Sequence, residues 1–166
     1  HEYILLSKEI KTLEYYLQLQ KLRFPEKLNF YFDIDQNLDI EELSIPPMML
    51  QPFIENSIEH GFRKAQDPGN ITIRIKKGVD NIILETEDDG IGILASEKEK
   101  SNKKNIYQSL ATKITEERIQ NMNKGRKQKI SLNIIDLSTL GSGQKGTRVS
   151  ISIPNKFINS EKNFKL

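Results

Sequence analysis

The hydrophobic spacing of this chain changes several times between the period of a helix and that of a strand, which requires a fold containing both. Apolar residues recur at three- and four-residue steps from Ile4 to Phe24, as in an amphipathic helix that ends before Pro25. From Leu28 to Ile34 they alternate with polar residues, as in a half-buried strand. The same two patterns predict helices over 46–60 and 109–123, and strands over 71–75, 81–87, 129–137 and 147–153.

Prolines and polar runs set the boundaries of these elements. Pro46 and Pro47, preceded by Ser44, fit the first turn of the second helix, because amide groups there have no partner within the helix. We expect a bend or a restart of the helix at Pro52. Residues 94–108 are polar, lysine-rich and aperiodic, which indicates a mobile loop, and the chain after Pro154 is expected to fray.

Composition excludes several classes of function. The 166 residues fit one soluble domain, and the 25 basic and 23 acidic residues are spread along the chain, so nucleic acid is not an expected partner. The absence of cysteine excludes disulfides and zinc–thiolate sites. No apolar run approaches the roughly 20 residues that span a bilayer. The chain opens at His1 within a helical pattern, so we expect a fragment of a longer protein.

The second predicted helix carries two polar residues at the edge of its apolar face. Asn56 and His60 are four residues apart and are therefore neighbours on the helix surface, where a side chain can face a cleft. Alone, they are equally consistent with a surface asparagine and a helix end. The predicted buried face consists of Leu50, Phe53, Ile54, Ser57 and Ile58.

Two glycine-containing segments follow predicted strands or lead into them. Asp88-Asp89-Gly90-Ile91-Gly92 leaves the strand over 81–87, and glycines at this spacing let a backbone approach a flat ligand closely. A loop with Gly141, Gly143 and Gly146 enters the last strand at Thr147. Each segment alone is also explained by an ordinary exposed turn.

In order and spacing, the three segments together resemble the ATPase superfamily shared by histidine kinases, DNA gyrase and the heat-shock chaperone of the ninety-kilodalton class. The resemblance is closest to sensor histidine kinases of the LytS and YehU type, and it extends from about Leu6 to Pro154. Its most specific block is residues 45–61, IPPMMLQPFIENSIEHG.

This resemblance implies an α+β fold, the two-layer α/β sandwich of the Bergerat type, with a mixed sheet under helices and a long N-terminal helix projecting from it. It also implies three parts. Residues 1–25 are then a connecting helix, 26–155 the ATP-binding catalytic domain, and 156–166 a flexible tail.

The resemblance also assigns roles at a Mg²⁺–ATP site. Asn56 is then the magnesium ligand, since a neutral oxygen suits a hard ion that keeps waters and phosphates as its other ligands. Asp88 accepts a hydrogen bond from the adenine amino group, Gly90 and Gly92 lie against the base, and His60 flanks the nucleotide.

Further contacts are implied after these. Thr147, after Gly146, completes the adenine contact. The lysine-rich stretch 97–104 corresponds to a lid over the phosphates, with Lys103 as a candidate cation. The helix start at Ser109 and Leu110 offers backbone amides to the phosphates.

The implied activity is transfer of the ATP γ-phosphoryl group to a histidine on an upstream dimerisation segment. The Pro-His-Phe type motif of that segment is absent here, so no catalytic residue is expected in this chain. A response regulator, and possible pairing of two copies, are the implied partners. The parent protein is expected to be membrane-bound in the inner membrane, with this part in the cytoplasm.

Two single positions and one four-residue segment depart from relatives in the superfamily. Glu59 stands where kinases often have lysine or arginine, residues 109–112 replace a Gly-x-Gly-Leu run, and Pro52 stands where gyrase-like hydrolases have a glutamate base. The alternatives are therefore a non-catalytic nucleotide-sensing or dimerisation module, a serine kinase acting on a partner protein, and a clamp-type ATPase.

Overall fold

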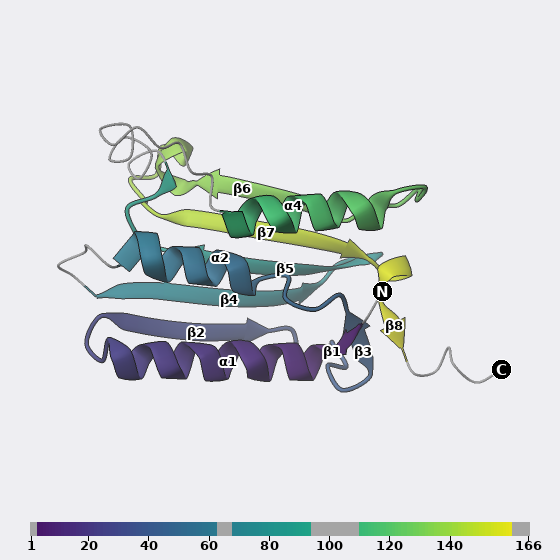
Figure 1. The fold of residues 1–166 in the computed structure, drawn as a ribbon, viewed down its shortest axis with the longest axis horizontal. Helices are drawn as coiled ribbons and strands as arrows, with labels where there is room; N and C mark the ends of the chain where they lie inside the picture. The colour runs from purple at the N-terminus through teal and green to yellow at the C-terminus, as the bar shows by residue number, and fades with distance from the viewer. Residues whose placement is uncertain (1–2, 63–67, 94–109, 161–166) are drawn as a thin grey trace.

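The computed structural model describes residues 3–62, 68–93 and 110–160, and its centre is a mixed five-stranded sheet (Figure 1). β2 is parallel to β4, whereas the other neighbouring strands are antiparallel. The predicted strands are confirmed, β2 at its predicted bounds. In sheet order they are β2 (Leu28–Ile34), β4 (Gly69–Lys77), β5 (Asn81–Asp88), β7 (Thr147–Pro154) and β6 (Ser131–Asp136).

In the described part of the chain, helices cover one face of this sheet. α1 (Leu6–Arg23) lies beside β2, and α2 (Gln51–Asn56) lies over β4 and β5 (Figure 1). α2 continues into a wider π-helical turn, η1 (Ser57–Phe62), and α4 (Leu110–Asn123) covers β7 and β6. The predicted two-layer α+β sandwich is therefore confirmed. None of the helices in the described residues is both long and apolar enough to cross a membrane.

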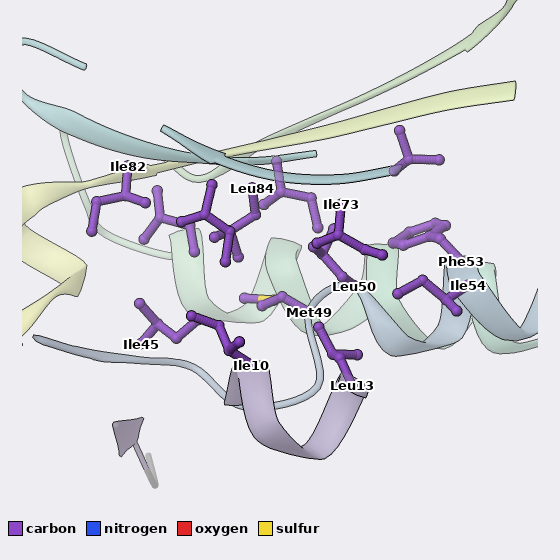
Figure 2. Packing of buried hydrophobic residues seen from close by; sticks show 14 of the residues in the cluster. Ile10, Leu13, Ile45, Met49, Leu50, Phe53, Ile54, Ile73, Ile82 and Leu84 are labelled. Atoms are coloured by element: carbon purple, nitrogen blue, oxygen red, sulfur yellow. The ribbon is translucent and has the colours of Figure 1, made fainter. Parts of the chain in front are cut away.

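The core lies between the sheet and the helices. Figure 2 shows Met49 and Leu50 between Ile10 on α1 and Ile73 and Leu84 on the sheet. Burial of each such side chain contributes about 1.5–3 kcal/mol. The strands supply alternate residues to this core, namely Ile71, Ile73, Ile75, Ile82, Leu84, Val149, Ile151 and Ile153.

The long N-terminal helix is present, but the expectation that it projects from the sandwich is wrong. Leu6, Leu13 and Leu17 are at most 1% exposed and belong to the same core as the strands. The apolar stripe of α1 therefore has its partner within this chain.

α2 begins at Gln51, so the prediction of a helix from Pro46 is wrong. Residues 43–45 instead form a strand, in which Ser44 pairs with residues at both ends of the chain and is not a helix cap. Met48 has a φ of 55°, in the left-handed region, so a right-handed helix that starts at Pro46 cannot continue through Met48. Of the predicted bend or restart at Pro52, the structure shows a helix start: Pro52 falls in the first turn of α2, where proline is tolerated.

A second, three-stranded sheet joins the two ends of the described chain. Its order is β1 (Ile4–Leu5), β3 (Leu43–Ile45) and β8 (Asn159–Ser160). Before β8, the short helix η3 (Asn155–Phe157) places Phe157 in the core with 1% exposure. The expectation that the chain frays after Pro154 is therefore wrong for residues 155–160.

The sheet face away from the helices carries a network of charges across three strands. Arg74 on β4 lies 2.9 Å from Glu85 and 3.2 Å from Glu87, both on β5. Arg148 on β7 donates a 2.6 Å hydrogen bond to Glu87. Burial tends to raise the pKa of Glu87, but the hydrogen bonds and charges of Arg148 and Arg74 outweigh it and hold that pKa below 4.5.

Candidate functional site

A buried polar group on the helix side of the sheet is the carboxylate of Asp88, the last residue of β5, which is 5% exposed. Its Oδ2 accepts a 2.6 Å hydrogen bond from the Ser57 hydroxyl. Its Oδ1 accepts from the backbone N–H groups of Gly90, at 2.9 Å, and Thr147, at 3.3 Å. A carboxylate has about four acceptor positions, so the three donors fix its orientation and leave about one position for a ligand.

The surroundings of Asp88 disfavour its charge. Burial, the largest influence, raises the pKa of Asp88 above 3.8, with a smaller push from the charge of Asp89. The hydrogen bonds from Ser57, Gly90 and Thr147 act in the opposite direction without cancelling it. Because the folded-state pKa is raised, ionisation of Asp88 lowers stability as pH rises from 3.8 through that pKa. A ligand that donates a hydrogen bond to the Asp88 carboxylate lowers the free-energy cost of keeping that group ionised.

Gly146 allows β7 to begin directly beside the end of β5. Its φ is 114°, and a Cβ atom there would overlap the carbonyl oxygen of Asp88. Only glycine accepts both conditions. This close approach brings the Thr147 N–H to the Asp88 carboxylate.

Gly92 makes a similar approach to a second buried aspartate. Its φ is 83°, and an added Cβ would lie 2.9 Å from Oδ2 of Asp136, at the end of β6. Oδ1 of Asp136 accepts from the Ser138 backbone at 2.9 Å and from its hydroxyl at 2.6 Å, which begins the short helix η2 (Leu137–Leu140). Gly92 thus packs against protein here, and its contact with a base stays a prediction.

The neighbouring aspartate, Asp89, has a different role. Its Oδ1 accepts from the Asn70 backbone at 2.7 Å, and its Oδ2 accepts from the Asn70 side chain at 2.6 Å. Asp89 therefore ties the end of β5 to the start of β4, whereas Asp88 faces the helices.

Asn56 connects the end of α2 to the first turn of α4. Its Nδ2 donates a 3.0 Å hydrogen bond to the Thr112 hydroxyl. The acceptor end of the same amide is Oδ1, a neutral oxygen of the kind that binds Mg²⁺. Among the residues that the structure describes, no three acidic or histidine side chains gather as a metal site. A single neutral donor suits an ion that takes its other ligands from water and phosphates.

Of the predicted site residues, the structure brings together Asp88, Gly90, Gly146 and Thr147. Asn56 is connected to this group through its sequence neighbour Ser57, which donates a hydrogen bond to Asp88. Leu110, by contrast, begins α4 with its side chain 69% exposed.

Other predicted residues are not placed in full. His60 belongs to the π-helical turn η1, but its side chain is outside the described part of the chain. Lys103, Ser109 and the predicted loop over 94–108, which includes the predicted lid over 97–104, also lie outside the described residues.

Sequence reasoning missed the site contributions of Ser57, Thr112 and Asp136. The sequence pattern predicts that Ser57 lies on the buried face of its helix, and a buried hydroxyl needs a hydrogen-bond partner. A polar partner for Ser57 could therefore have been predicted, although not that it is Asp88. Thr112 and Asp136 carried no comparable signal, because their contacts depend on segments far away in the sequence.

Comparison with known sequences gives one family over most of the chain. Residues 47–156 match the family described as "Histidine kinase-, DNA gyrase B-, and HSP90-like ATPase". The sensor protein LytS of Staphylococcus saprophyticus is 29% identical over 165 residues, covering 96% of this chain and 26% of that protein. The sensor histidine kinase BtsS of Escherichia coli is 36% identical over 87 residues, covering 52% of this chain and 15% of that protein. The chain thus spans about a quarter or less of these relatives.

Solved structures share the fold. The catalytic domain of histidine kinase ThkA superposes with a TM-score of 0.64 at 16% identity, covering 93% of this chain and 97% of that one. ThkA in complex with the response regulator protein TrrA gives a TM-score of 0.58 at 16% identity, covering 92% of this chain and 41% of that one.

Proposed function

Because the chain belongs to the family of histidine kinase-, DNA gyrase B- and HSP90-like ATPases, we propose that it binds Mg²⁺–ATP and transfers the γ-phosphoryl group to a histidine of another segment. The observation that carries the proposal is the buried Asp88 carboxylate, held by Ser57, Gly90 and Thr147. An oriented acceptor of this kind suits an exocyclic amino group.

At the base end, Asp88 accepts from the adenine amino group at its remaining acceptor position. The Asp88 side chain is already fixed, so little side-chain entropy is lost when the base binds. Thr147 and the backbone near Gly90 and Gly92 lie against the base. His60 flanks the nucleotide.

At the phosphate end, Oδ1 of Asn56 is a magnesium ligand. The ion, when bound, neutralises phosphate charge. The hydrogen bond between Asn56 and Thr112 supports a role for the start of α4 at the phosphate end. In the proposal, the backbone amides of Ser109 and Leu110 bind the phosphates. Lys103, from the predicted lid, supplies a cation.

Among the side chains that the structure describes on the helix of Asn56, none is a clear base for hydrolysis. Pro52, four residues earlier, cannot accept a proton. The Glu55 carboxylate accepts a 2.9 Å hydrogen bond from Gln51 on its own helix, and Glu59 is exposed on η1. These features favour transfer to an external acceptor over hydrolysis by a clamp-type ATPase. In this proposal the protein positions ATP and neutralises charge, while the nucleophile is the imidazole of the acceptor histidine.

The partners are proposals as well. They are the dimerisation segment with the acceptor histidine, a response regulator that takes the phosphoryl group next, and a second copy of the parent protein. Placement of this part in the cytoplasm, below a membrane-bound sensor region, also stays a prediction.

A transfer assay in trans tests the function. The 166-residue chain, γ-labelled ATP and magnesium are mixed with the dimerisation segment of its parent protein, and acid-labile, base-stable phosphate is measured. We expect slow labelling of the segment, because no tether supplies a high effective concentration when the two parts are separate molecules. The chain alone should take up essentially no phosphate, because the Pro-His-Phe type motif is absent from it. Tight ATP binding without transfer at any concentration would favour a nucleotide-sensing module.

A further inference from the structure

The strongest feature outside the proposed site is a cluster of basic side chains at the loop that joins α4 to β6. Four of them belong to residues 124–129 of this loop and one to η3, and all are exposed: Lys124, Arg126, Lys127, Lys129 and Lys156. None of the five forms an ion pair with another residue that the structure describes. Without them, basic residues no longer outnumber the 23 acidic residues of the chain. The positive charge of the chain is therefore concentrated in this basic cluster.

Two sets of contacts hold the basic cluster in shape. Asn123, the last residue of α4, donates a 2.8 Å hydrogen bond to the Ile130 carbonyl oxygen and accepts another of 2.8 Å from the Ile130 N–H. These bonds close the loop at its base. The guanidinium carbon of Arg126 lies 4.5 Å from the centre of the Phe157 ring, which brings the loop beside η3 and Lys156. The five charges are therefore presented together by a closed loop and its neighbour.

Stabilisation of α4 explains only part of this arrangement. Cations at the C-terminal end of a helix interact favourably with its dipole, but the effect falls off within the last turn. Lys124 directly follows α4, whereas Lys127 and Lys129 lie further along the loop and Lys156 belongs to another element. Like charges that gather without counter-charges repel one another, so these three favour a partner that is negatively charged.

The surroundings of the basic cluster favour a lipid surface over a protein or a nucleic acid. The core of a protein–protein interface is apolar and rich in aromatic side chains. Within the described residues 123–130 and 154–157, no large hydrophobic side chain is exposed, and Phe157 is buried. Single-stranded nucleic acids are bound by stacking on aromatic side chains, which this surface does not offer. Anionic lipid headgroups, by contrast, attract clustered lysines through charge alone.

We propose that the basic cluster binds the anionic headgroups of a membrane surface, with no segment inserted into the bilayer. β6, about 20 Å long, runs from this loop to Asp136 beside Gly92 (Figure 1). The basic cluster and the proposed nucleotide site therefore lie toward opposite ends of this strand, so lipid and ATP can bind at the same time. Binding to lipid goes beyond the proposed function and does not depend on it.

Sedimentation with vesicles tests the proposal on the 166-residue chain without nucleotide. The vesicles contain phosphatidylcholine alone, or with about one third phosphatidylglycerol. The test variant keeps Arg126 on Phe157 and replaces the three lysines of the loop: Lys124→Gln, Lys127→Gln and Lys129→Gln. The control variant removes the same charge from exposed positions in α1 and just after it, beside β2 at the other edge of the sheet: Lys8→Gln, Lys11→Gln and Lys27→Gln.

The wild type should bind the phosphatidylglycerol vesicles at about 0.1 M salt and be released at about 1 M, because salt screens exposed charges. It should not bind phosphatidylcholine alone. Each lysine near an anionic surface contributes about a fivefold factor in affinity, so the test variant should bind roughly a hundredfold more weakly. The control variant should stay within about twofold of the wild type, because its lysines lie more than a screening length from the lipid. All six positions are exposed, so both variants should fold, which a thermal melt checks.

Several outcomes overturn the proposal. A folded wild type that does not bind the phosphatidylglycerol vesicles contradicts it, as does a test variant that binds them like the wild type. Equal losses in the test and control variants make the binding a property of net charge and not of the basic cluster. If single-stranded nucleic acid displaces the wild type from the vesicles but does not bind the test variant, the partner is a nucleic acid. Calorimetric titration of ATP decides the proposed function separately.

Discussion

The Ser57 hydroxyl donates a 2.6 Å hydrogen bond to Oδ2 of Asp88, across 31 positions of sequence. This contact joins the helical turn that follows Asn56 to the strand end that carries Asp88. The two ends of the proposed nucleotide site are therefore held together by one buried interaction. The same hydroxyl lies 3.0 Å from the Phe53 carbonyl oxygen, which keeps it on the buried side of its helix.

Ser57→Ala should weaken both the fold and the site. Loss of the donor leaves Asp88 buried with one hydrogen bond fewer, which costs about 1–3 kcal/mol of unfolding free energy. ATP affinity should fall with it, because Asp88 is less well oriented. Urea titration and calorimetry measure the two effects. Ser152→Ala is the control: it also removes a hydrogen-bond partner, that of Asn81, so it should cost stability but leave ATP affinity unchanged.

Gly146→Ala should be far more damaging than Gly143→Ala. Both glycines have positive φ, but a Cβ at position 146 would overlap the Asp88 carbonyl oxygen, whereas one at position 143 has nothing within 4 Å. We expect a loss of about 1–2 kcal/mol at position 143 from backbone strain alone, and a larger loss or failure to fold at position 146. Thermal melts of the two variants provide the comparison. Equal stabilities would show that β7 does not need this close approach to β5.

Asn56→Ala should abolish the magnesium-dependent part of ATP affinity. The ratio of affinities with magnesium and with a chelator is the quantity to measure, and it should approach one. Thr112→Val removes only the hydroxyl that accepts from Asn56, so this ratio should fall but stay above that of Asn56→Ala. If both mutations lower affinity equally with and without magnesium, Asn56 has only a structural role.

Glu87→Gln tests the charge network on the sheet face away from the helices. The folded-state pKa of Glu87 is lowered, so its contribution to stability is present above about 4.5 and is lost as pH falls through the folded pKa. We expect Glu87→Gln to lose about 1 kcal/mol at pH 7 and to match the wild type at low pH. The difference should also shrink in high salt. A loss independent of pH and salt would show that packing, and not charge, is what Glu87 supplies.

Local patterns were sufficient to predict most of the elements. The alternation over residues 28–34 predicts β2 at its observed bounds, since the apolar face of that strand is at least partly buried and Tyr31 and Asp33 on the other face are exposed. Long-range pairing caused the main error. Ser44 looks like a helix cap in sequence, but it pairs with Leu5 and Asn159, so α2 starts later. The buried position of α1 was missed for a related reason, because an apolar stripe does not specify which surface covers it.

For the proposed site, the sequence predicted Asp88 and Asn56 but not the groups that hold their side chains. The Thr147 N–H that donates to Asp88 is 59 positions away, and Thr112 is 56 positions from Asn56. Spacing along the chain does not report such contacts. Gly92 was predicted to let the backbone approach a ligand, yet the group it approaches here is Asp136. The close approach of Gly146 to the Asp88 backbone was not predicted.

The most direct test of the account compares two neighbouring aspartates by calorimetric titration of ATP, with magnesium, into the wild type, Asp88→Asn and Asp89→Asn. Asp89 holds Asn70 and faces away from the site, so its variant controls for loss of charge and of local hydrogen bonds. The account predicts binding to the wild type, a roughly ten- to hundredfold loss in Asp88→Asn, and near wild-type affinity in folded Asp89→Asn. A folded wild type that does not bind ATP, or a folded Asp88→Asn variant that binds it as the wild type does, would contradict it.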